Sequence, residues 1–137
     1  MDAQCYLDLL VIWAYDRGYS VFFERNGDDS ICDNSKIISI KNTVTKESQL
    51  FTLLHECGHL LIYKNGDVFN LNDIRASYSE GSQIYKTYRV IEEIEAWKRG
   101  RQLAKRLNIS IDQDRWDRAI SRAITKYIKW SVSVGGY

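Results

Sequence analysis

The only two histidines of the chain, His55 and His59, stand four residues apart, with Glu56 directly after the first. On an α-helix, residues i and i+4 lie one above the other on the same face. Neutral imidazoles at this spacing suit Zn²⁺, and the glutamate between them is the usual general base of a zinc protease. The H-E-x-x-H pattern therefore predicts a metal site with Glu56 as the catalytic base. The alternative is an ordinary amphipathic helix that carries two unrelated histidines.

A helical wheel divides the motif helix into two faces. At about 100 degrees per residue, His59 and Glu56 fall on the side of His55, and leucines fill the opposite side. Cys57 lies about 160–200 degrees from the histidines, so we expect it to pack as a small hydrophobe and not to bind their ion. Gly58 has no side chain at the edge of the metal face, and we expect another backbone to approach there.

A catalytic zinc needs a third protein ligand and an open position for water. Because the chain has no third histidine, that ligand must be a carboxylate or a thiolate. Glu93 falls in the middle of the apolar stripe of a later helix, whereas Glu92 lies at its edge and Glu95 faces away. A carboxylate on a packed face is rarely tolerated unless it is paired or coordinates a metal. Glu93 is therefore the predicted third ligand, and the alternative is a buried salt bridge to Arg89 or Arg17.

Hydrophobic periodicity predicts the elements that must hold these residues. The predicted helices span 4–16, 45–63, 84–108 and 112–132, and the predicted strands span 19–24 and 36–40, with 31–32 as the start of a partner strand. Residues 68–83 read as a long irregular loop, which is often functional when it lies beside a site. The pattern indicates one α+β domain over 1–137, mainly helical, with a small antiparallel sheet packed on the motif helix.

Composition limits the function classes. Apolar residues make up 45% of the 137, and the formal net charge of +1 gives no global attraction to nucleic acid or to an anionic membrane. We see no apolar run of membrane-spanning length and no signal peptide at the N-terminus. The three cysteines form no C-x-x-C pair or disulfide framework, so we expect a reduced, cytoplasmic protein with no membrane partner.

With both histidines and Glu93 in place, the chain resembles the ImmA/IrrE-type metallopeptidases of bacteria and their mobile elements. Those proteins run from a strand into a hydrophobic stretch ending in H-E-L-G-H-L-L-L, then a variable loop, then a helix with E-x-x-A. Here the stretch over 50–62 ends in H-E-C-G-H-L-L-I, and Glu93-Ile94-Glu95-Ala96 supplies the second motif. The family continues with an acidic or amide residue and then Phe-Ala, whereas this chain has Trp97 there. The resemblance covers residues 36 to 107 and marks a divergent branch.

The resemblance implies a zincin-like domain with a gluzincin-like arrangement, in which His55, His59 and Glu93 hold one Zn²⁺ per chain. It also implies a protein substrate, a regulator such as a repressor, and an origin in a phage or mobile element. In the mechanism we expect, the ion lowers the pKa of a water to about 7. Glu56 takes the proton of that water and passes it to the leaving amine.

Two further roles stay open among several residues. A second donor for the oxyanion is expected, and the candidates are Tyr63, Tyr78, Tyr85 and Tyr88. Carboxylates usually orient ligating histidines, and the candidates in the loop are Asp67, Asp73 and Glu80.

Two other functions compete with proteolysis. A zinc-bearing scaffold could sequester a partner without cutting it, as an antitoxin or inhibitor does, although a purely structural site has no need of Glu56. Nucleic-acid binding through the last helix is the other, because its cations recur at spacings of three and four: Arg115, Arg118, Arg122, Lys126 and Lys129. A solvated basic face is the commoner explanation of such a pattern.

Overall fold

The computed structural model describes residues 2–65 and 77–133. Over these residues it contains four helices and a three-stranded sheet, so the predicted mainly helical α+β fold is confirmed. The helices are α1 (Ala3–Tyr15), α2 (Lys46–Asn65), α4 (Gln83–Arg106) and α5 (Gln113–Ser131). The strands are β1 (Ser20–Glu24), β2 (Ser30–Cys32) and β3 (Ile37–Lys41). These bounds lie within a few residues of those expected from periodicity.

Side-chain caps set where three of the helices begin. Asp2, Ser82 and Asp112 each accept a hydrogen bond from the backbone N–H three residues later, at the start of α1, α4 and α5. Thr45 does the same for Ser48 at the start of α2, over 3.1 Å. Such caps satisfy N–H groups that have no partner inside the helix. Asp112, the first residue of the helix expected over 112–132, is the residue that caps α5.

The expected antiparallel sheet is wrong in one detail, because the sheet is mixed. Its order is β1-β3-β2, with β1 parallel and β2 antiparallel to β3. β3 lies at the centre of the sheet, and Ile38 and Ile40 on it are buried. The chain leaves β1 and crosses to the far side of β3 before it forms the β2–β3 hairpin. Neighbours in sequence, β1 and β2, are therefore not neighbours in the sheet.

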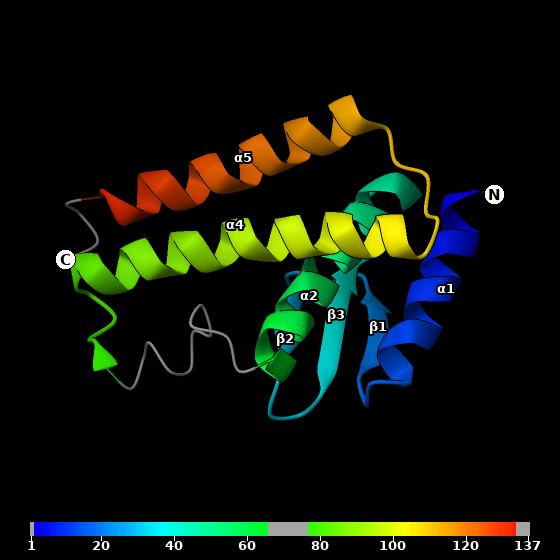
Figure 1. Ribbon diagram of the computed structural model, residues 1–137, viewed down its shortest axis with the longest axis horizontal. Helices are drawn as coiled ribbons and strands as arrows, with labels where there is room; N and C mark the ends of the chain where they lie inside the picture. The colour runs from blue at the N-terminus through cyan, green and yellow to red at the C-terminus, as the bar shows by residue number, and fades with distance from the viewer. Residues whose placement is uncertain (1, 66–76, 134–137) are drawn as a thin grey trace.

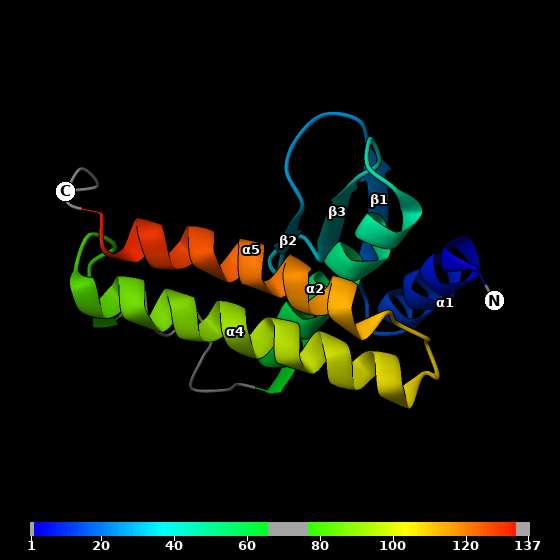
Figure 2. The same cartoon turned by 90° about the horizontal axis from the view of Figure 1, so that it is seen from above.

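Helix α2 lies at the centre of the molecule. One side of it packs on α1 and β3, and the other packs on α4, which runs alongside α5 (Figures 1 and 2). The leucine face predicted for the motif helix is buried in the core, since Leu53, Leu54 and Leu60 are 0% exposed. The opposite face is therefore left for the polar residues of the motif. Over the described residues, no helix has both the length and the apolar character needed to cross a bilayer.

Candidate metal centre

The metal face of α2 presents both histidines toward α4. His59 and Glu56 are buried, and the side chain of His55 is only 13% exposed. The two imidazole rings meet edge to face with their centroids 4.8 Å apart, so they are neighbours, as expected for i and i+4 positions. Cys57 is buried among the apolar residues of the core, as expected, and burial raises the pKa of its thiol. It lies outside the group of possible metal ligands.

Two glycines allow α2 and α4 to approach closely enough to form the site. A Cβ on Gly58 would lie 1.9 Å from the carbonyl oxygen of Ala96, and a Cβ on Gly100 would lie 2.5 Å from that of Leu54. Real Cβ atoms essentially never come within 3.0 Å of other heavy atoms, so neither position accepts a side chain without movement of a helix. The close approach predicted at Gly58 is confirmed, and the helix that approaches is the one that carries Glu93.

Glu93 reaches both histidines from α4. Its Oε2 lies 2.8 Å from Nε2 of His55, and its Oε1 lies 3.2 Å from Nε2 of His59. The three potential ligand atoms all lie within 4.8 Å of one another. Ligands about 2.1 Å from a tetrahedral zinc stand about 3.4 Å apart, so the donor types suit such an ion and the atoms lie within about 1.4 Å of the spacing that it needs. Sequence reasoning therefore chose the carboxylate that the fold brings to the histidines.

Glu92 orients the second histidine, and sequence reasoning missed this role. Its Oε1 accepts a hydrogen bond from Nδ1 of His59 over 3.2 Å, and its side chain is 0% exposed. A carboxylate at Nδ1 fixes the tautomer that leaves Nε2 free for a metal. Of the loop residues expected in this role, Glu80 is exposed, and Asp67 and Asp73 lie outside the described residues. The signal available in the sequence was a second glutamate beside Glu93 at the edge of the packed stripe.

The histidines and carboxylates of the site shift one another's pKa values. Burial by itself would lower the pKa of His59, but hydrogen bonds to Glu92 and Glu93 outweigh it and raise the pKa to about 10. The pKa of His55 is also raised, because Glu56 and Glu93 together outweigh burial. Burial would raise the pKa of Glu93, but the two histidines hold it well below its usual range. The pocket therefore favours positive charge at Nε2, which a divalent cation also supplies.

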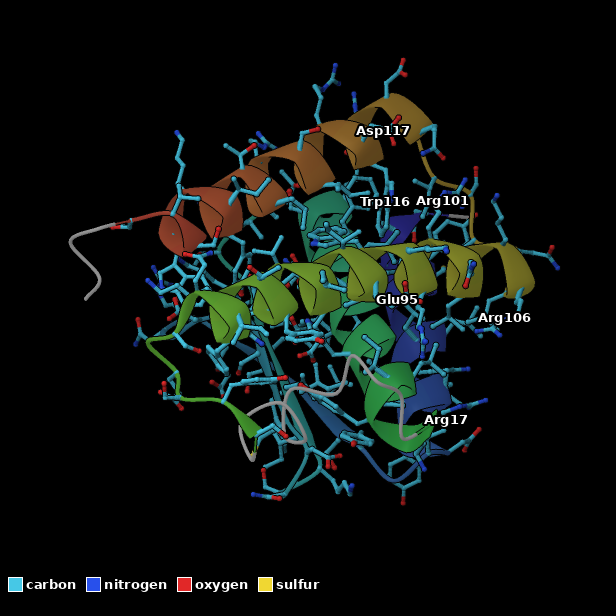
Figure 3. The ribbon with its side chains drawn as sticks, turned by 60° about the vertical axis from the view of Figure 1, so that its left-hand side comes forward. Arg17, Glu95, Arg101, Arg106, Trp116 and Asp117 are labelled. Carbon is cyan, nitrogen blue, oxygen red and sulfur yellow. The ribbon has the colours of Figure 1, made fainter. Side chains whose placement is uncertain are left out.

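A series of aromatic rings packs against the imidazole of His55. The Trp97 ring stacks on the imidazole at 4.4 Å with an interplanar angle of 13°. Trp97 in turn meets Trp116 edge to face at 5.1 Å, and Trp116 meets Phe51 at 5.2 Å. Figure 3 shows Trp116 on the side of α5 that faces α4. Trp97 thus fixes the plane of a predicted ligand.

Arg89 links the metal centre to α5. Its guanidinium lies 3.5 Å from Oε1 of Glu93 and donates to the hydroxyl of Tyr127 over 3.4 Å. The salt bridge between Arg89 and Glu93, which the sequence offered as the alternative to a metal ligand, is therefore present. It coexists with the contacts of Glu93 to both histidines. Glu95 instead forms a pair with Arg99 over 2.9 Å, and its side chain is 21% exposed.

The centre opens into a groove with a volume of about 880 Å³. Its walls come from α2, α4, α5 and residues 29–31 at β2, and Glu56 lines it together with His55 and His59. Of the four tyrosines proposed as oxyanion donors, Tyr63 lines this groove, and Tyr127, which the sequence did not single out, lines it as well. Tyr78 stacks on Tyr88, and neither is among the residues that line the groove.

Comparisons with known proteins find no match for this chain among protein-family models, curated proteins or solved structures.

Proposed function

We propose that the chain is a zinc-dependent metallopeptidase in which His55, His59 and Glu93 hold the ion and Glu56 is the general base. One observation carries the proposal: the Nε2 atoms of two histidines from one helix both meet a single buried carboxylate from another helix. Glu56 supports hydrolysis over a purely structural site, because it lines the open groove beside the histidines. A closed structural zinc site would usually hold four protein ligands.

A zinc ion in this site would lower the pKa of a water to about 7 and polarise a scissile carbonyl. The residues of the chain perform the other steps. Glu56 accepts a proton from the attacking water and delivers it to the leaving amine. Arg89, Tyr63 and Tyr127 line the same groove and supply donors for the oxygen on which negative charge develops. Glu92 and Trp97 keep the two imidazole rings in place throughout.

The resemblance to ImmA/IrrE-type metallopeptidases suggests the class of substrate, a regulatory protein such as a repressor. Within this proposal the protein acts in the cytoplasm. The free state of all three cysteines supports that compartment, because disulfides form mainly in oxidising ones.

Elemental analysis and two single variants test the metal centre. We expect about one zinc per purified chain, from a single three-ligand site. Glu93→Ala is expected to lose the metal, and Glu56→Gln to keep it. Glu95→Ala is the matched control, because this glutamate lies two residues from Glu93 but pairs with Arg99 and is outside the group of possible metal ligands. Full zinc content in Glu93→Ala would contradict the ligand assignment.

Proteomics of cells that express the wild type or Glu56→Gln tests the reaction and finds the substrate. We expect a new protein terminus that occurs only with the wild type, since the variant keeps its zinc but lacks the base. A zinc-loaded wild type that yields the same termini as Glu56→Gln would refute proteolysis. That result would favour a scaffold that sequesters its partner without cutting it.

A further inference from the structure

Three cations of α5 stand along one wall of the groove. Arg118, Arg122 and Lys126 recur every four residues, are exposed, and line the groove together with His55 and Glu56. Lys129, the last cation on the basic face of this helix, is exposed but does not line the groove. The basic face of α5 is therefore turned in part toward the predicted site and is not only a solvated surface.

The other charged residues of the groove already have partners. Arg115 pairs with Glu47 over 3.2 Å, and the backbone N–H of Lys41 donates to Asp29 over 2.6 Å. Arg89 pairs with Glu93. Within the described part of the chain, no carboxylate lies within ion-pair distance of Arg118, Arg122 or Lys126. The α5 wall therefore carries three positive charges that form no ion pair with the described residues.

The spacing of these cations is unfavourable for the free helix. Like charges at i and i+4 destabilise a helix, and this wall contains two such pairs in succession. A bound anion removes that repulsion, and guanidinium groups suit carboxylates because they can bind both oxygens at once. We propose that Arg118, Arg122 and Lys126 bind acidic side chains of the polypeptide segment that lies in the groove beside Glu56. The inference rests on the proposed function and names the kind of segment that the site accepts.

The dimensions of the wall match an extended peptide. Four residues along a helix advance about 6 Å, so the three cations span about 12 Å. Alternate residues of an extended strand point to the same side and advance about 6.7 Å. A segment with an acidic residue at every second position therefore places one carboxylate near each cation.

A protein segment fits this groove better than a nucleic acid does. Asp29, Glu47, Glu56 and Glu93 line the same groove, so a phosphate backbone would also meet carboxylates there. A peptide with acidic residues on one side only can turn its other side to those groups. The net charge of +1 also gives the whole chain little general attraction to nucleic acid.

The test measures binding of labelled ten-residue peptides to zinc-loaded Glu56→Gln protein by fluorescence polarisation. One peptide carries glutamate at every second position, and the matched peptide carries glutamine there. We expect the glutamate peptide to bind at least tenfold more tightly at low salt, with the difference shrinking as salt screens the charges. Adding R118Q, R122Q and K126Q is expected to abolish the difference.

The matched control adds K105Q, R106Q and K129Q, which remove three exposed charges outside the groove and are expected to keep the preference. Equal binding of the two peptides, or equal loss in both triple variants, would overturn the inference. Tighter binding of a single-stranded DNA of the same length, lost with R118Q, R122Q and K126Q, would also overturn it. Because binding is measured on Glu56→Gln, a failure of hydrolysis would refute the proposed function without altering this result.

Discussion

Helix propensity and tertiary packing predict opposite effects on stability when Gly58 is replaced by alanine. From helix propensity alone, Gly58→Ala should stabilise α2 by about 1 kcal/mol, because glycine is the poorer helix former. In the folded chain, the added Cβ would lie 1.9 Å from the carbonyl oxygen of Ala96 on α4. The structure therefore predicts that the substitution forces the two helices apart.

The size of the effect follows from the same contact. The Cβ must reach at least 3.0 Å from the carbonyl oxygen, so the backbones must separate by about 1 Å. Overpacking costs about 1–3 kcal/mol, and a clash with backbone belongs at the upper end because the backbone cannot rotate away. After the gain in helix propensity, we expect a net loss of about 2 kcal/mol, or a fall in Tm of about 8 °C. Metal–ligand distances tolerate only about 0.2 Å, so zinc affinity should fall more than tenfold.

Thermal unfolding of the zinc-free protein and zinc titration against a competing chelator measure the two effects separately. Gly81→Ala is the matched control, because a Cβ there meets no atom within 4 Å and the backbone is not left-handed. It should leave both Tm and zinc affinity unchanged. If Gly58→Ala bound zinc as the wild type does and were more stable, the close approach of α2 and α4 would be refuted.

Three further predictions concern the environment of His59. Glu92→Gln should keep the fold but weaken zinc binding about 10- to 100-fold, because Nδ1 loses its carboxylate partner, whereas Glu95→Gln should leave chelator-competition titrations unchanged. The pKa of His59 rises from 6.5 to about 10 in the folded metal-free chain, so zinc should displace a proton at pH 7. Calorimetry in buffers of different ionisation enthalpy should detect that proton, and identical binding heats in all buffers would contradict it. The raised pKa stabilises the metal-free fold fully below pH 6.5, so its Tm should fall as the pH rises toward 10.

The sequence by itself determined the local structure and the chemistry of α2. The period of its leucines, the four-residue spacing of His55 and His59 and the place of Glu56 between them are properties of a single helix, and they hold wherever that helix packs. The same reasoning placed Cys57 in the core and Glu93 on the packed stripe of α4. Burial of an unpaired carboxylate is unfavourable, so an acidic residue on an apolar stripe indicates a partner. This signal can be seen in the sequence because it depends on the periodicity of a single helix.

Only the tertiary structure decided which groups from different elements meet. Glu92 reaches Nδ1 of His59, and Trp97 stacks on His55, because Gly58 and Gly100 allow α4 to lie directly against α2. The place of β1 beside β3 follows from which strand is most deeply buried and not from sequence order, so the antiparallel expectation failed. Sequence periodicity reports the faces of each element but not the distance or rotation between two of them. Those depend on the packing of side chains that lie far apart in the chain.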